Sequence, residues 1–217
     1  MLLPNADTIS VNSQIHTGIT LIGNLASRGI DMMYPIQSFI NPADSGSCIV
    51  ELDIQNLFMR HITNKELAGI KNKYRQLDIK KDELGNMYSL DTELSVRDIT
   101  GRNTILNGSF IPDLGNVMFL ALFESHPDVK SFIHNTNIQL QKGYNPKGQP
   151  LPVKVMSVYE CTFEKEEKFS NVTLITTPFY TQLKSDGFLG LDFLRHFNVI
   201  FDFQNDKFYL KRTHKGN

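Results

Sequence analysis

A repeated sequence frame near the two ends of the chain constrains its architecture most. The run Gly187–Leu210 combines a glycine turn, a short apolar stretch suited to a helix, and two apolar segments around Asp202-Phe-Gln-Asn205. A weaker copy lies at Val50–Met59, where Asp53-Ile-Gln-Asn56 occupies the same apolar frame. Because Asp and Asn favour turns between extended segments, both copies predict hairpins. The repeat indicates two similar lobes in one polypeptide, with the first one incomplete.

Composition places the chain among packed globular proteins. It has 217 residues, of which 41% are hydrophobic, so it can bury a sizeable core. Lys and Arg number 22 against 23 acidic residues, which gives no field for attracting nucleic acid or anionic lipid. No apolar run is long enough to span a bilayer. We therefore expect neither nucleic acid nor a membrane as partner.

The spacing of apolar residues is mostly that of strands. Residues 8–25 are predicted to be extended, and Leu94, Val96 and Ile99 alternate with polar residues before a turn at 100–103. The chain then returns through 104–106, and a second strand is predicted from Gly108 to Ile111. Thr63 with Glu66 three residues later predicts a capping box at the start of a short helix. The class is therefore mainly β.

The sequence resembles the retropepsin-like (pepsin and retropepsin type) aspartic peptidases, including bacterial aspartyl-protease-like proteins. The resemblance rests on Gly187–Leu210 and on Asp113-Leu114-Gly115, which follows the apolar residues Phe110-Ile111 where these enzymes carry Asp-Thr/Ser-Gly. It implies a mainly β fold, with a retropepsin-like closed β-barrel lobe, a short helix near the C-terminus, and a partial N-terminal lobe of the same type. It covers residues 92–212 well and residues 8–60 faintly.

This resemblance divides the chain into four parts. We expect a partial lobe over residues 1–60 that holds only the C-terminal half, and a linker with a possible short helix over 61–91. The retropepsin-like lobe follows over 92–212, and residues 213–217 form a tail. The first residues carry no signal peptide, although the resemblance suggests an exported or periplasmic protein if the chain is a fragment.

Asp113 is the candidate catalytic residue that the resemblance implies, with Leu114 and Gly115 supporting the turn that holds it. The chemistry requires two carboxylates that share one proton around one water molecule. Leu114 departs from the family pattern, because it replaces the hydroxyl residue that normally bonds across the lobe interface. Asp7-Thr8-Ile9 lacks the glycine of the motif, so Asp113 is the one credible catalytic aspartate.

The second aspartate has two possible sources, a homodimer or a missing N-terminal lobe. The alternative interpretation is that Asp113 only caps a turn, as Asp beside Gly often does. Gly143, Tyr144 and Gly148 lie in a predicted hairpin that could form a flap over substrate, or a plain surface hairpin.

Other reactive side chains are assigned structural roles. Asp192 is predicted to cap a helix N-terminus, and Asp53 and Asp202 are predicted to be hairpin residues. The six histidines lack metal-ligand spacing and no Gly-x-Ser-x-Gly elbow is present, so neither a metal site nor another cofactor is expected. Cys48 and Cys161 are expected to be free thiols, with a disulfide between them as the alternative.

Two functions follow from these observations. The first is an aspartic-type endopeptidase that hydrolyses peptide bonds of a peptide or protein substrate by carboxylate-activated water, if a second aspartate is supplied. The alternative is a catalytically inactive retropepsin-like lobe that acts as a peptide-binding or assembly module.

Overall fold

The computed structural model describes residues 49–56, 58–81, 88–114, 116–125, 127–134, 139–144, 150–177 and 184–213. Several subjects of the sequence predictions lie outside these ranges, namely Asp7, residues 8–25, Cys48, Gly115, Gly148 and residues 214–217 of the predicted tail. The elements in chain order are β1 (Ile49–Asp53), β2 (Phe58–His61), α3 (Asn64–Ile70), η2 (Lys71–Lys73), β3 (Arg75–Lys81), β4 (Tyr88–Arg97), β5 (Asn103–Pro112), β6 (Leu120–Phe123), α4 (Pro127–His134), β7 (Gln139–Tyr144), β8 (Pro150–Phe163), β9 (Glu167–Thr177), β10 (Gly187–Leu189), α5 (Leu191–Leu194), β11 (Phe197–Asp202) and β12 (Lys207–Arg212).

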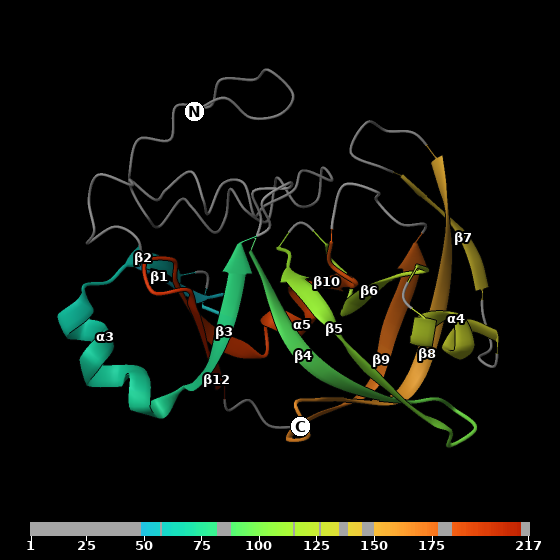
Figure 1. The fold of residues 1–217 in the computed structure, drawn as a ribbon, viewed down its shortest axis with the longest axis horizontal. Helices are drawn as coiled ribbons and strands as arrows, with labels where there is room; N and C mark the ends of the chain where they lie inside the picture. Colours follow the sequence, from blue (N-terminus) through green and yellow to red (C-terminus); the bar gives the residue numbers. More distant parts are fainter. Residues whose placement is uncertain are drawn as a thin grey trace.

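The described strands form one large mixed sheet, which confirms the mainly β class. Its order is β2-β1-β11-β12-β3-β4-β5-β10-β6-β9-β8-β7, and β4 also pairs with β8. That extra pairing closes β4, β5, β10, β6, β9 and β8 into a circuit of neighbouring strands. Figure 1 shows α3 at one end of the molecule beside β1 and β2, and β7 and α4 at the other. The retropepsin-like closed β-barrel and the domain boundaries stay predictions.

The hairpin predicted around residues 94–106 is present as β4 and β5. The two strands pair antiparallel from Leu90 with Phe110 to Arg97 with Asn103. The separate second strand predicted at Gly108–Ile111 is wrong, because β5 runs without a break to Pro112. Gly108 does not interrupt the strand; a Cβ atom there would lie 2.8 Å from a carboxylate oxygen of Asp186. The glycine admits this close approach, and its backbone stays extended.

Asp98 organises the turn between β4 and β5. Its Oδ1 accepts hydrogen bonds from the backbone N–H groups of Thr100 and Arg102 at 2.9 and 3.0 Å, and from the Thr100 hydroxyl at 2.7 Å. Gly101 adopts a φ of +86°, which favours glycine. Burial acts to raise the pKa of Asp98, but these hydrogen bonds outweigh it and hold the pKa below the usual value.

This depressed pKa gives a pH-dependent stability. A carboxyl whose folded-state pKa is lowered stabilises the fold above its unfolded pKa of about 3.9, and the stabilisation disappears as the pH falls through the folded value. We expect Asp98→Asn to be less stable than the parent chain at pH 7 and nearly equal to it at strongly acidic pH. Urea unfolding at several pH values measures this. A constant difference across the series would contradict it.

The predicted capping box and short helix are both present in α3. The Thr63 hydroxyl accepts from the Glu66 N–H at 3.2 Å, and the Glu66 carboxylate accepts from the Thr63 N–H at 2.8 Å. After this helix, the charged residues 75–81 form β3, which pairs with both β12 and β4. Their charges remain largely exposed because only Ile79 of this strand is buried. The mixture of polar and apolar residues that favoured a linker over this range belongs, in residues 75–81, to a strand with one solvent-exposed face.

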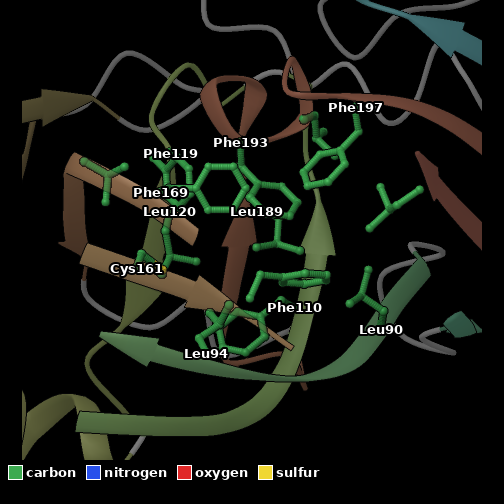
Figure 2. Packing of buried hydrophobic residues seen from close by; sticks show 14 of the residues in the cluster. Leu90, Leu94, Phe110, Phe119, Leu120, Cys161, Phe169, Leu189, Phe193 and Phe197 are labelled. Carbon is green, nitrogen blue, oxygen red and sulfur yellow. The ribbon is translucent and has the colours of Figure 1, made fainter. Parts of the chain in front are cut away.

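Phenylalanine side chains fill the interior around α5 (Figure 2). The Phe193 ring lies edge-on to Phe119, with 5.5 Å between ring centroids, and tilted against Phe163 and Phe197 at 5.0 and 5.1 Å. All four rings are almost completely buried. A helix of one turn has little stability of its own. Tertiary packing therefore fixes α5.

β11 is buried on both faces. Val199 and Phe201 belong to the main core, whereas Ile200 joins a second apolar cluster with Ile49 and with Leu67 of α3. The nearly continuous apolar sequence of this strand reflects two covered faces.

Candidate active site

Asp113 lies immediately after β5 and is held by its backbone. The preceding residues Phe110 and Ile111 are completely buried, and Asp113 itself is only 8% exposed. β10 runs parallel to β5 with Leu189 opposite Pro112, and the Asp113 N–H donates to the Leu189 carbonyl at 2.8 Å. The residue therefore sits where two parallel strands end together, with its main chain fixed to the neighbouring strand.

The turn after β10 is hydrogen-bonded to residues 116–119, which follow Asp113 in the chain. The Gly190 N–H donates to the Phe119 carbonyl at 3.1 Å, and the Leu191 N–H donates to the Asn116 carbonyl at 2.6 Å. A Cβ atom on Gly190 would lie 2.0 Å from the Met118 carbonyl oxygen. The two segments that the sequence placed in one lobe, Asp113-Leu114 and Phe188-Leu-Gly190, are thus brought together.

Leu114 points into the protein interior. It is completely buried and belongs to the main core cluster, together with Phe119 and Leu189. At this position the resembled enzymes carry a hydroxyl that bonds across the lobe interface. Here the side chain packs in the hydrophobic core instead.

A hydroxyl residue at position 114 should therefore weaken the fold. We expect Leu114→Thr to lower the free energy of unfolding by about 2 kcal/mol, because it removes buried apolar volume and buries a polar group in an apolar cluster. Chemical denaturation measures the change, and Leu114→Met serves as the control because it approximately conserves volume. A more stable threonine variant would show that the hydroxyl finds a partner.

Asn116 was missed by the sequence reasoning. Its Oδ1 accepts from the Met118 N–H at 3.1 Å, which stabilises the loop, while its buried Nδ2 has no hydrogen-bond partner within the described structure. A buried amide donor without a partner costs roughly 1–3 kcal/mol. Its position three residues after Asp113 was the one available signal, and asparagine in a turn is too common to be informative.

Asp186 is a second carboxylate near β5 that the sequence reasoning did not single out. Its side chain accepts from the Ser109 N–H at 2.9 Å, and its own N–H donates to the Ser109 carbonyl at 2.6 Å. Ser109 precedes Asp113 by four residues, which span about 13 Å along a strand. Asp186 therefore lies too far along β5 to share a proton with Asp113.

The remaining predicted aspartates have structural roles. Asp53 accepts from the Asn56 N–H at 3.0 Å, and Asp202 accepts from the Asn205 N–H at 3.1 Å, so both are hairpin residues as predicted. The prediction that Asp192 caps α5 is wrong. The N-cap is Gly190, and Asp192 lies in the first turn, 2.6 Å from the Arg195 guanidinium. An acidic residue in the first turn interacts favourably with the helix dipole without capping it.

Residues of the predicted flap lie in the β7–β8 hairpin. Gly143 pairs with Leu151, and Tyr144 pairs with Pro150, in an antiparallel register. Gly148 lies outside the described residues. Whether this hairpin acts as a flap or as a plain surface hairpin stays a prediction.

Cys161 and one surface depression are further places in the described part of the chain where reactive groups could act. Cys161 is a free, buried cysteine, and burial raises the pKa of its thiol to about 12, which makes it a poor nucleophile. No cluster of three metal-ligating side chains occurs among the residues described. A depression of about 480 Å³ is lined by Asp91, Thr92, Glu93, Asn107, Gly108, Ser109 and Glu164, away from the Asp113 loop. Its Glu164 is already bonded to the Glu93 N–H at 3.0 Å.

None of the described helices is both long and apolar enough to cross a bilayer.

Comparison with known proteins gives distant structural likenesses. No protein-family profile and no curated protein sequence matches the chain. An aspartic proteinase from Irpex lacteus is 13% identical with a TM-score of 0.39, covering 64% of this chain and 47% of its own. Conglutin gamma, a basic 7S globulin from lupine seeds, is 10% identical with a TM-score of 0.38, covering 69% and 43%. The chain thus spans less than half the length of either protein, and neither likeness assigns it a function.

Proposed function

We propose that this chain carries one carboxylate of an aspartic-type endopeptidase site, with Asp113 as that carboxylate and a peptide or protein as substrate. The placement of Asp113 carries the proposal. It is nearly buried at the end of an apolar strand, and its N–H is bonded to the strand beside it. A rigid main chain under a carboxylate is what positions the group for chemistry rather than for a surface turn.

The proposed lobe is the retropepsin-like barrel. The closed circuit of strand pairs from β4 to β8 supports this. The hydrogen bonds from the turn at Gly190 to the residues that follow Asp113 also support it. In such a lobe the side chain of Asp113 would face a substrate groove, and the β7–β8 hairpin would be its flap.

The reaction requires a second carboxylate facing Asp113. Two carboxylates in contact cannot both ionise, so the pair holds one proton. The ionised carboxylate takes a proton from water, whose oxygen attacks the peptide carbonyl carbon. The other carboxyl gives its proton to the carbonyl oxygen. The tetrahedral gem-diol then collapses. The carboxyl that took a proton from water gives it to the leaving nitrogen, and a hydroxyl of the gem-diol returns its proton to the other carboxylate, which releases a carboxylic acid and an amine.

The buried Leu114 supports a second candidate function. Its side chain cannot form the hydroxyl bond that normally joins the two lobes in the resembled enzymes. A lobe without that bond could retain its fold and bind an extended peptide without cleaving it, as a binding or assembly module. The two functions differ in turnover rather than in binding.

Cleavage of an unfolded, disulfide-free protein by the full chain separates them. The enzyme is expected to cleave at acidic pH, to lose activity as the pH rises and both carboxylates ionise, and to be blocked by a statine-type inhibitor. Binding of the same protein without turnover over the whole acidic range would favour the binding module. Cleavage that persists at neutral pH and ignores the inhibitor would reject an aspartic mechanism.

A further inference from the structure

The turn between β8 and β9 holds two residues in a strained backbone conformation. Phe163 lies opposite Glu167, so three residues form the loop. Glu164 has a φ of 52° and Lys165 a φ of 63°, in the left-handed region that is costly for a residue with a Cβ atom. Three-residue hairpin loops usually have negative φ at their first two positions and positive φ only at the third. Strand pairing alone therefore does not require the strained form, and a relaxed form of the loop is available.

The Glu164 carboxylate is bonded to two other strands in this form. Its Oε1 accepts from the Glu93 N–H at 3.0 Å and from the Thr92 hydroxyl at 2.5 Å. Its Oε2 forms an ion pair with the Arg75 guanidinium of β3 at 3.1 Å. The Glu164 N–H also donates to the Glu93 carbonyl at 2.9 Å. These contacts to β3 and β4 offset the cost of the strained turn.

Glu164 lies at the point where β4 changes its partner. β4 pairs with β3 over residues 88–90 and with β8 over residues 94–97. Between these ranges, the Glu93 N–H is bonded to the Glu164 side chain. In the sheet order, the pairing of β3 with β4 connects the closed circuit of strands to β12, β11, β1 and β2. That joint consists of three residue pairs, so the turn reinforces a narrow connection.

Other carboxylates of the turn pair with the same two outer strands. Glu166 lies 2.9 Å from a second nitrogen of Arg75, and Glu167 lies 2.8 Å from the Arg212 guanidinium of β12. The Arg212 guanidinium also lies 4.4 Å from the centre of the Phe169 ring on β9. The turn thus contacts β3 and β12, whereas its own two strands belong to the closed circuit.

We propose that the β8–β9 turn is a latch with two states. In the closed state, Glu164 holds the turn in its strained form and reinforces the joint between β3 and β4. When the carboxylate loses its partners, the turn relaxes and the joint loses this reinforcement. The strain couples the two events, because it is relieved at the moment when the turn releases β4. The latch concerns the sheet and does not depend on the role of Asp113.

A comparison of glycine with alanine at position 165 tests whether the strain depends on Glu164. Both substitutions remove the ion pair of Lys165 with Glu93, so the two variants differ only in a Cβ atom. In an otherwise unchanged chain, Lys165→Gly is expected to have a folding equilibrium constant about three-fold or more above that of Lys165→Ala. In a Glu164→Ala chain we expect no such advantage, because the released turn has already relaxed. Urea unfolding measures all four constants.

An equal advantage of glycine in both chains would overturn the proposal, since the hairpin itself would then impose the strain. No advantage in either chain would also overturn it. Asn171 provides the matched control, because it is exposed, has a φ of 55° and lies within β9 rather than in the turn. The difference between Asn171→Gly and Asn171→Ala is expected to be the same with and without Glu164→Ala. A change in that difference would assign the coupling to general destabilisation and overturn the proposal.

Hydrogen exchange tests whether release also loosens the joint. In Glu164→Ala, the Glu93 amide is expected to exchange about ten-fold faster or more, and the amides of residues 79–81 should also exchange faster. The amide of Ser95, where β4 pairs with β8, should stay within about two-fold of its rate in the parent chain. Unchanged exchange at Glu93 or at 79–81 would overturn the proposal. If Glu164→Ala does not fold, Glu164→Gln replaces it in both experiments, because the amide keeps the volume and removes the charge.

Discussion

Asp113→Asn is expected to lower acid-dependent peptide cleavage at least about a hundred-fold, because general acid–base catalysis by a positioned side chain contributes roughly that much or more. The amide has nearly the same shape as the carboxyl group, so Asp113 can be replaced with little change in packing. It can neither take a proton from water nor share one with a second carboxylate. Initial cleavage rates of an unfolded protein at acidic pH measure the loss.

The control for this substitution is Asp192→Asn. Asp192 is partly exposed in the first turn of α5 and forms a surface ion pair with Arg195. Such pairs contribute about 0–1 kcal/mol to stability. We expect the cleavage rate of Asp192→Asn to remain within about two-fold of that of the parent chain, because loss of a surface ion pair has little effect on stability. Equal loss in both variants would assign the effect to folding, and full activity in Asp113→Asn would reject the role of Asp113.

Gly190→Ala is expected to lower the free energy of unfolding by about 3 kcal/mol or more, through overpacking against the main chain. Its φ of −86° suits any residue, so the cost comes from contact rather than from backbone strain. The new methyl group would lie 2.0 Å from the Met118 carbonyl oxygen and 2.6 Å from that of Asn116. No side-chain rotation relieves a clash with backbone. The loop after Asp113 must therefore move.

Gly69→Ala provides the matched control. Gly69 lies within α3, and a Cβ atom there would meet nothing within 4 Å. Alanine in a helix interior is favoured over glycine by about 1 kcal/mol. The same chemical change should thus stabilise at one position and destabilise at the other, as read from thermal and urea unfolding. Similar small effects at both would show that the loop beside Gly190 yields easily.

Local signals predicted the hairpins and the helix start because their chemistry lies within a few residues. Thr63 and Glu66 form the capping box, and Asp53 and Asp202 form the same turn twice. The length of β5 could not be predicted in this way. Gly108 has the signature of a break, yet it remains in the strand because Asp186, far away in sequence, lies against it. Tertiary contacts of this kind leave no local pattern.

In the candidate site, too, local sequence signals were predictive and tertiary contacts were not. The apolar residues before Asp113 and the two residues after it made Asp113 a candidate. The sequence placed Gly190 in the same predicted lobe as Asp113, but it did not predict the hydrogen bonds between the two segments. The orphaned amide of Asn116 and the bonding of Asp186 to Ser109 depend on loop geometry. Asp192 lies two residues after Gly190 in a plausible capping position, but α5 begins at Leu191, two residues earlier than a cap at Asp192 requires.

The position of β11 determines the order in which this chain can fold. β11 pairs with β1, and β12 pairs with β3, so strands from early and late in the chain are neighbours. Among the described hairpins, β1–β2 is synthesised first and β11–β12 last. Until β11 and β12 emerge, β1 and β3 each lack one of their two neighbours and present an open strand edge. We expect refolding of this sheet to be slow, because its central pairing joins distant parts of the sequence.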